Sequence, residues 1–141
     1  YLSRLKAQAF ISELQADELL ITADTVVCIG GEILGKPAGR KEAVKMLQRL
    51  SGNRHTVVTG VSLTTATSQR TFSVQTEVYF KELTEEEITY YVDTYQPFDK
   101  AGAYGIQEWI GYIGITRIDG SFYNVMGLPV QRLYEELQKF K

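Results

Sequence analysis

The sequence predicts an α/β protein with a mixed sheet, because strand-like and helix-like patterns alternate along it. Three stretches have the composition of strands: Glu18 to Ile29, Arg54 to Thr64 and Arg70 to Phe80. Two others repeat apolar residues at helical spacing, Arg40 to Leu50 and Thr84 to about Tyr95. The 141 residues contain no repeat, linker or break in composition, so we expect residues 1–141 to form a single domain.

The first part of the chain predicts a helix followed by an apolar strand. Leu2 to Leu14 has apolar residues at helical spacing. Glu18 to Ile29 is apolar at nearly every position except around Thr22–Thr25, which is typical of a central strand covered on both faces. Gly30-Gly31 then predicts a tight turn into a short strand, Glu32 to Leu34.

The middle of the chain carries clear boundary signals. The expected helix from Arg40 has an apolar face made of Ala43, Met46, Leu47 and Leu50. The stretch from Arg70 to Phe80 alternates apolar and polar residues, as a half-buried antiparallel strand does. Thr84 and Glu87 form a capping box that predicts the start of the next helix, and Pro97 ends it.

The last third predicts a loop, a hairpin and a final helix. The string DKAGAYGIQEW is expected to be a loop of small residues that enters a short helix. The string IGYIGITRIDGSFYNV is expected to be a hairpin that turns at Asp119-Gly120. Pro129 then begins a helix, and its expected inward-facing residues are Val130, Leu133, Tyr134 and Leu137.

Composition and charge exclude several classes of function. The net charge of −2 argues against broad binding to a nucleic-acid polymer, which needs a basic face, although a few lysines can still hold one nucleotide. No apolar run reaches the length that spans a membrane. Cys28 is the sole cysteine, so no intrachain disulfide is possible, and no signal peptide is evident. These features favour a reducing, cytoplasmic setting.

Asp24 is the strongest local anomaly, since it stands in the middle of an apolar strand. Burying an unpaired carboxylate costs several kcal/mol. One explanation is a structural carboxylate held by backbone N–H groups or by a lysine. The other is a carboxylate that reaches into a cleft and binds a divalent metal or acts as a general base. The residues themselves leave both open.

Two lysines are candidate phosphate ligands, because an ammonium group is a compact point charge that phosphates accept readily. Lys36 lies just after the short strand, and a tight hairpin at Gly30-Gly31 would bring it back towards Asp24. Lys6 lies on the expected first helix. On local grounds a solvated surface position is the favoured explanation of either lysine.

The small-residue string contains two further candidates. Tyr104 could pack against a base or sugar, and Gln107 could read a base edge with its amide. The string is no GxGxxG fingerprint and follows no expected strand, so it predicts no dinucleotide fold. On local grounds a turn that packs tightly against a neighbouring helix is the favoured explanation of the string. His55 is expected to be structural, since no second histidine or cysteine accompanies it and no GxSxG motif occurs.

Several strings together resemble the Maf proteins. ITADTVV, GEILGKP, LSGNRHTVVTGV, FDKAGAYGIQ and DGSFYNVMGLPV occur in this order, from about Leu5 to Leu137. Each string alone is weak, and five in order are specific. Maf proteins are nucleoside triphosphate pyrophosphatases related in fold to the inosine triphosphatases. The resemblance therefore implies a mixed, largely antiparallel twisted sheet flanked by helices, with the family's first strand missing.

The resemblance also implies an activity and a site. It implies hydrolysis of the α–β phosphoanhydride of dTTP or UTP with Mg²⁺ or Mn²⁺, as part of nucleotide-pool sanitation. Asp24 matches the family's proton acceptor and would meet the metal. Thr25 and Gln107 match positions tied to substrate choice. Lys36 resembles a catalytic lysine that contacts phosphates, and Lys6 resembles another functional lysine. The family also suggests a homodimer.

The sequence departs from the family pattern at its start. It begins YLSRLKAQAF, apparently inside a helix, without the family's Ser-x-Ser-Pro-Arg-Arg loop or the acidic residue that follows it. If the chain is a genuine fragment, weak or no catalysis is expected; if a segment was cleaved or disordered, the full protein should be active. The alternative from another class is a non-catalytic nucleotide-binding regulator of septum formation and cell division, acting through protein partners.

Overall fold

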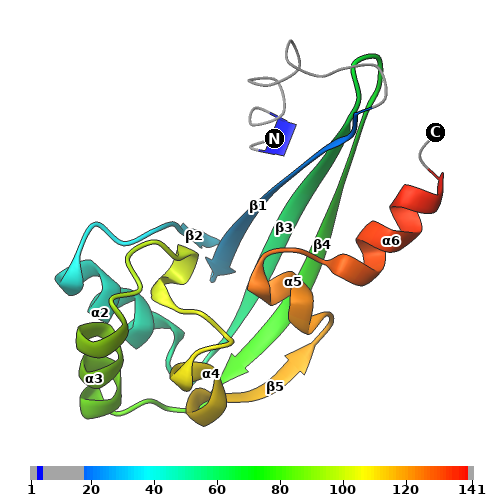
Figure 1. Cartoon of the computed structure of the whole chain (residues 1–141). Helices are drawn as coiled ribbons and strands as arrows, with labels where there is room; N and C mark the ends of the chain where they lie inside the picture. Colours follow the sequence, from blue (N-terminus) through cyan, green and yellow to red (C-terminus); the bar gives the residue numbers. More distant parts are fainter. Residues whose placement is uncertain (1–2, 5–17, 140–141) are drawn as a thin grey trace.

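The computed structural model describes residues 3–4 and 18–139, and it is an antiparallel sheet flanked by helices (Figure 1). The described elements are β1 (Leu20–Ile29), β2 (Glu32–Leu34), α2 (Arg40–Leu50), β3 (Arg54–Thr64), β4 (Gln69–Phe80), α3 (Glu85–Tyr95), the 3-10 turn η2 (Ala101–Ala103), α4 (Trp109–Gly114), β5 (Ile115–Asp119), α5 (Phe122–Met126) and α6 (Val130–Lys139). The strand order is β2-β1-β3-β4-β5, and all four pairings are antiparallel. The predicted α/β class is confirmed.

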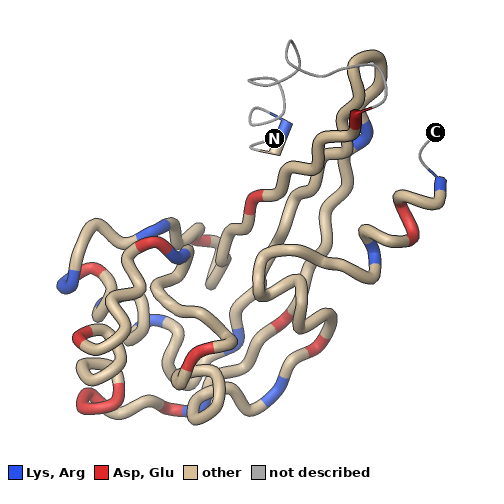
Figure 2. The backbone as a smooth tube through the Cα atoms, in the orientation of Figure 1, with Lys and Arg blue, Asp and Glu red and all other residues tan. Residues whose placement is uncertain are grey.

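The helices are not spread evenly over the sheet. Figure 1 shows α2, α3 and α4 gathered at one end, while the β3–β4 hairpin extends beyond them towards α6. Much of the charge of the described chain lies around that helical end, with basic and acidic segments interspersed (Figure 2). None of the helices in the described ranges is long and apolar enough to cross a membrane. The predicted helix from Leu2 to Leu14 lies largely outside the described residues.

Strand β1 is less covered than the sequence suggested. Its buried residues are Val27 and Ile29, whereas Ile21 is 41% exposed. The pairing with β2 involves only Val27 to Ile29, because β2 is three residues long. The prediction of a strand covered on both faces is therefore wrong for the described part of the chain.

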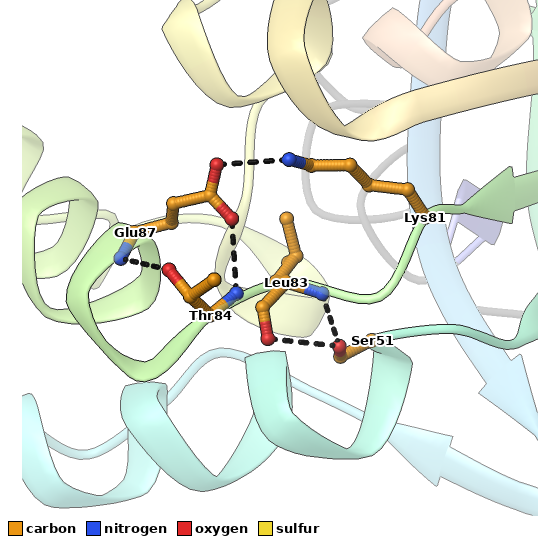
Figure 3. Close-up of polar contacts among 5 residues, drawn as sticks. All are labelled: Ser51, Lys81, Leu83, Thr84 and Glu87. Atoms are coloured by element: carbon orange, nitrogen blue, oxygen red, sulfur yellow. Dashed lines mark hydrogen bonds and ion pairs between the residues drawn. The ribbon is translucent and has the colours of Figure 1, made fainter.

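The main core lies between the sheet and the helical end. Ala43, Leu47 and Leu50 of α2 are fully buried there, on the face that the sequence indicated. The predicted capping box of α3 is confirmed: Glu87 N–H donates to Thr84 Oγ1 at 3.0 Å, and Thr84 N–H donates to Glu87 Oε1 at 2.9 Å (Figure 3). These bonds, with that from Lys81, lower the pKa of Glu87.

The predicted hairpin at Asp119-Gly120 is wrong. Trp109 to Gly114 is helical, and β5 pairs with β4 rather than with a strand that follows it. The Ser121 hydroxyl accepts a hydrogen bond from Asn124 N–H at 3.2 Å, so it caps α5 where the second strand was expected. Gly120 has φ +126°, which lets the chain turn away from the sheet beside Thr76.

Helix α6 is confirmed, but two of its four expected inward residues face solvent. Leu133 is buried, and Leu137 packs against the cluster that contains it, whereas Val130 and Tyr134 are 42% and 66% exposed. Glu136 turns inward in their place. Its side chain is 2% exposed and forms ion pairs with Arg70 at 2.7 Å and Arg132 at 3.0 Å.

These ion pairs set the rotation of α6. The hydrogen bond from Arg132, and the charges of Arg70 and Lys139, lower the pKa of Glu136 and keep it ionised. Because the carboxylate must face Arg70 of β4, the face between Leu133 and Leu137 packs on the sheet. The pattern of apolar residues alone therefore does not predict how α6 is rotated on the sheet.

Asn124 of α5 is fully buried and joins two strands. Its amide Nδ2 donates to Val57 O at 3.3 Å, Val74 O at 3.0 Å and Thr76 Oγ1 at 3.0 Å. The main-chain carbonyl oxygen of Asn124 accepts a hydrogen bond from Thr59 Oγ1 at 3.2 Å. A side chain that satisfies groups on β3 and β4 together fixes α5 against the sheet.

Replacing Asn124 by Ala should lower the free energy of unfolding by about 3 kcal/mol, because buried oxygens on both strands lose their donor. Urea unfolding measures this change. The matched variant Asn53→Ala removes an exposed amide that bonds to Arg49 O and Ser51 O, and it should cost about 1 kcal/mol or less. Equal losses in the two variants would contradict the role assigned to Asn124.

His55 lies in the main core, as its structural interpretation requires. It is 1% exposed, its Nε2 lies 2.6 Å from the Tyr104 hydroxyl, and its ring stacks on Phe80. Its Nδ1 is buried and has no hydrogen-bond partner among the residues that the structure describes. Burial lowers the pKa of His55 to about 4, because the charged imidazolium would lose its water.

Stability should therefore fall as the pH falls below the ordinary histidine pKa of 6.5. Between pH 6.5 and pH 4 the unfolded chain binds a proton that the folded chain does not, so the loss from pH 7 to pH 5 is about 2 kcal/mol. The chain has one histidine, so His55→Gln should remove this slope. Urea unfolding at the two pH values tests it, and an equal loss in the variant would contradict it.

Candidate active site

Five of the six residues that the sequence singled out line one cavity. The cavity has a volume of about 230 Å³, and these residues are Asp24, Thr25, Lys36, Tyr104 and Gln107. The remaining candidate, Lys6, lies outside the described residues. Five segments form the walls: β1, the turn after β2, Val57 of β3, the loop from Asp99 to Gln107, and the end of α5.

Strand β1 contributes two adjacent polar residues. Asp24 is half-buried rather than enclosed in the core, so its carboxylate keeps part of its solvation. Thr25 lies within hydrogen-bond distance of Thr59, with 2.9 Å between the two hydroxyl oxygens. Thr59 in turn donates to the carbonyl of Asn124, so a buried polar chain runs from α5 to the cavity. This chain holds the Thr25 hydroxyl in place.

The turn after β1 brings Lys36 to the cavity, as the sequence predicted. Gly30 and Gly31 have φ values of +55° and +81°, which a two-residue hairpin turn needs. The chain then runs back along β1 through β2, where Leu34 pairs with Val27. Lys36 follows two residues later, is exposed, and lines the same cavity as Asp24.

The loop from Asp99 to Gln107 packs closely against β1. Gly102 has φ +71°, and a Cβ at this position would lie 3.0 Å from Val27 Cγ2. Its N–H donates to Gly35 O at 3.1 Å, which ties the loop to the residue before Lys36. Glycine is required here both for the conformation and for the close approach. The small-residue string is thus a tight packing turn and a cavity wall together.

Tyr104 takes a different place from the one suggested by sequence. Its side chain is 6% exposed, with its ring edge against Phe80 and its hydroxyl on His55. Burial raises the pKa of its hydroxyl above the ordinary value, so the group is neutral. The ring therefore belongs to the core behind the cavity, and stacking on a base would require it to leave that core. Gln107, by contrast, is exposed at the cavity wall.

The cavity contains two charged residues that sequence reasoning missed, Asp99 and Lys100. Lys100 Nζ lies 3.3 Å from Asp99 Oδ1. The pKa of Asp99 is lowered, chiefly by the hydrogen bond from Lys100 and also by the charge of Lys36. Both residues directly precede the string AGAYGIQ. Because small side chains leave space for a ligand, charged residues beside this string could have been chosen from the sequence as candidate ligand-binding residues.

The carboxylates at the cavity are candidate ligands for a metal ion. Among the described residues, no group of three or more His, Cys, Asp or Glu side chains could hold a metal ion. Asp24 and Asp99 nevertheless line the same cavity. Mg²⁺ is commonly bound by one or two carboxylates together with substrate phosphates. This donor set therefore fits an ion that is completed by phosphate oxygens.

Comparison with known proteins gives a consistent family. The model of the family described as "Maf: Maf-like protein" matches residues 1–140. A protein of Bacteroides thetaiotaomicron named dTTP/UTP pyrophosphatase is 62% identical over 99% of this chain and 72% of its own length. Proteins of the same name from Phocaeicola vulgatus and Porphyromonas gingivalis are 57% and 58% identical over the same share of this chain, covering 72% and 71% of their own lengths. The chain belongs to the Maf family.

Proposed function

We propose that this protein hydrolyses dTTP and UTP to the nucleoside monophosphate and pyrophosphate. The observation that carries the proposal is that Asp24, Lys36 and Gln107 line one cavity although they come from three separate segments. A carboxylate, an ammonium group and a carboxamide match the three parts of the reaction: activation of water, binding of phosphates and reading of a base. The names of the similar proteins support the same substrates.

Each side chain has a distinct task in this proposal. The Asp24 carboxylate accepts a proton from the water that attacks the α-phosphorus. The Lys36 ammonium binds phosphate oxygens and neutralises the charge that develops on the leaving pyrophosphate. Lys6 adds a further positive charge. Thr25, held by Thr59, and Gln107 select the base, because an analogue that leaves their polar groups unpaired binds poorly.

A divalent cation is part of the proposal. Mg²⁺ or Mn²⁺ would be held by Asp24, with Asp99 as the second carboxylate of the cavity, and it would polarise the phosphates and neutralise their charge. The protein would act in the cytoplasm as a nucleotide-pool sanitiser. We further propose that residues 1–141 form one domain and that the protein is a homodimer.

Replacing Asp24 by Asn should reduce pyrophosphate release from dTTP by about 100-fold or more, because the amide cannot accept the proton. Asp119→Asn, which changes an exposed carboxylate outside the cavity, is the matched control and should leave the rate unchanged. A coupled pyrophosphate assay measures both variants. An unchanged rate in Asp24→Asn would rule out the base, and wild-type protein that binds dTTP without turnover would instead favour a nucleotide-binding regulator.

Mg²⁺ should bind weakly to the free protein and at least about 10-fold more tightly when a triphosphate is present, because two carboxylates, Asp24 and Asp99, line the described part of the cavity. Isothermal titration with Mg²⁺, with and without a non-hydrolysable dUTP analogue, measures the two affinities. The same titration of Asp24→Asn should lose most of the difference. Tight stoichiometric binding of Mg²⁺ to the nucleotide-free protein would contradict this account.

A further inference from the structure

We propose that Lys100 is a second phosphate-binding residue of the cavity and that it holds the triphosphate together with Lys36. The inference rests on the proposed function and adds a specific residue to it. Lys100 is not among the residues that the family resemblance marked in this chain. Four structural observations carry it: the position of Lys100, the support of its side chain, the anchoring of the loop beneath it, and the weakness of its present ion pair.

Lys100 and Lys36 are fixed relative to each other by the backbone. Both line the cavity, one on the loop that enters η2 and the other on the turn after β2. The hydrogen bond from Gly102 N–H to Gly35 O joins these two segments within two residues of each lysine. The two ammonium groups therefore serve the same cavity.

The stem of Lys100 is supported over Gly105. A Cβ at Gly105 would lie 2.8 Å from Lys100 Cε and 3.1 Å from Lys100 Cδ, so the absence of a side chain makes room for the stem. The Lys100 side chain is 29% exposed, much less than a free surface lysine. A lysine with a covered stem presents its ammonium group while losing little further conformational entropy on binding.

Gly105, against which the Lys100 stem lies, is itself held in place by a hydrogen bond. Gly105 N–H donates to the Tyr91 hydroxyl at 3.0 Å, and that hydroxyl donates to Glu108 Oε1 at 2.5 Å. Tyr91 is fully buried in α3, and its burial and the Glu108 carboxylate raise the pKa of its hydroxyl. The loop is therefore held from the core on one side and carries Lys100 on the other.

The present ion pair of Lys100 is readily exchanged. Its partner Asp99 is 79% exposed and is its neighbour in the sequence. Lys100 Nζ lies 3.3 Å from Asp99 Oδ1. Exposed pairs of this kind contribute little free energy, so a phosphate group with several anionic oxygens can replace the carboxylate. Lys36 and Lys100 would then neutralise the triphosphate together.

The test uses Lys100→Met, which keeps the stem and removes the charge, and Lys100→Arg, which keeps the charge. Lys45→Met is the matched control, since Lys45 is exposed on α2 outside the cavity. The probes are inorganic tripolyphosphate and the uncharged nucleoside thymidine, each titrated calorimetrically. Lys100→Met should bind tripolyphosphate about 10- to 100-fold more weakly than wild type, whereas Lys100→Arg should retain most of the affinity. Thymidine binding should not change.

A second variant approaches the same point without removing the lysine. Gly105→Ala places a methyl group against the Lys100 stem, and equally close to Glu108 Oε1, and it should weaken tripolyphosphate binding in the same direction. Equal affinity of wild type, Lys100→Met and Gly105→Ala for tripolyphosphate would overturn the inference. Because binding is measured without turnover, a protein that binds tripolyphosphate through Lys100 yet releases no pyrophosphate would refute the proposed function and leave the phosphate site standing.

Discussion

The cavity depends on the close contact between Gly102 and β1. The left-handed φ of Gly102 and the 3.0 Å approach of its missing Cβ position to Val27 leave room for no other residue type. From this contact the loop extends in both directions, towards Lys100 on one side and towards Gly105 and Gln107 on the other. The hydrogen bond to Gly35 O then sets the turn that carries Lys36. One backbone contact thus determines where the cationic and base-reading groups lie.

Buried hydrogen bonds on the core side hold β1 and the loop from Asp99 to Gln107 in place. On the β1 side, Asn124 joins β3 and β4 and reaches Thr25 through Thr59. On the loop side, Tyr91 holds Gly105, and His55 holds the hydroxyl of Tyr104. These buried hydrogen bonds hold the walls of the cavity from the core side, and the charged residues Asp24, Lys36, Asp99 and Lys100 line the cavity itself. Asp24 is half-buried, so its cost in an apolar strand is smaller than complete burial would impose.

Local patterns predicted what local interactions decide. The bounds of α2 and β3 and the capping box of α3 agree with the structure, because periodicity and caps act within a few residues. The hairpin at Asp119-Gly120 failed because the Ser121 cap and the contacts of Asn124 with distant strands outweigh an Asp-Gly turn signal. The rotation of α6 depends on Glu136 and Arg70, which are far apart in the sequence. Lys100 was not predicted from the sequence because its position near Lys36 likewise depends on a distant contact, the packing of Gly102 on β1.

The central claim is that one cavity holds the whole nucleotide, and a crystal structure of the protein with Mg²⁺ and an α,β-imido analogue of dUTP tests it most directly. The account predicts the triphosphate between Lys36 and Lys100, the α-phosphorus facing Asp24, and the pyrimidine edge against Gln107. A nucleotide bound outside this cavity, or one whose base rather than its phosphates meets the two lysines, would contradict it.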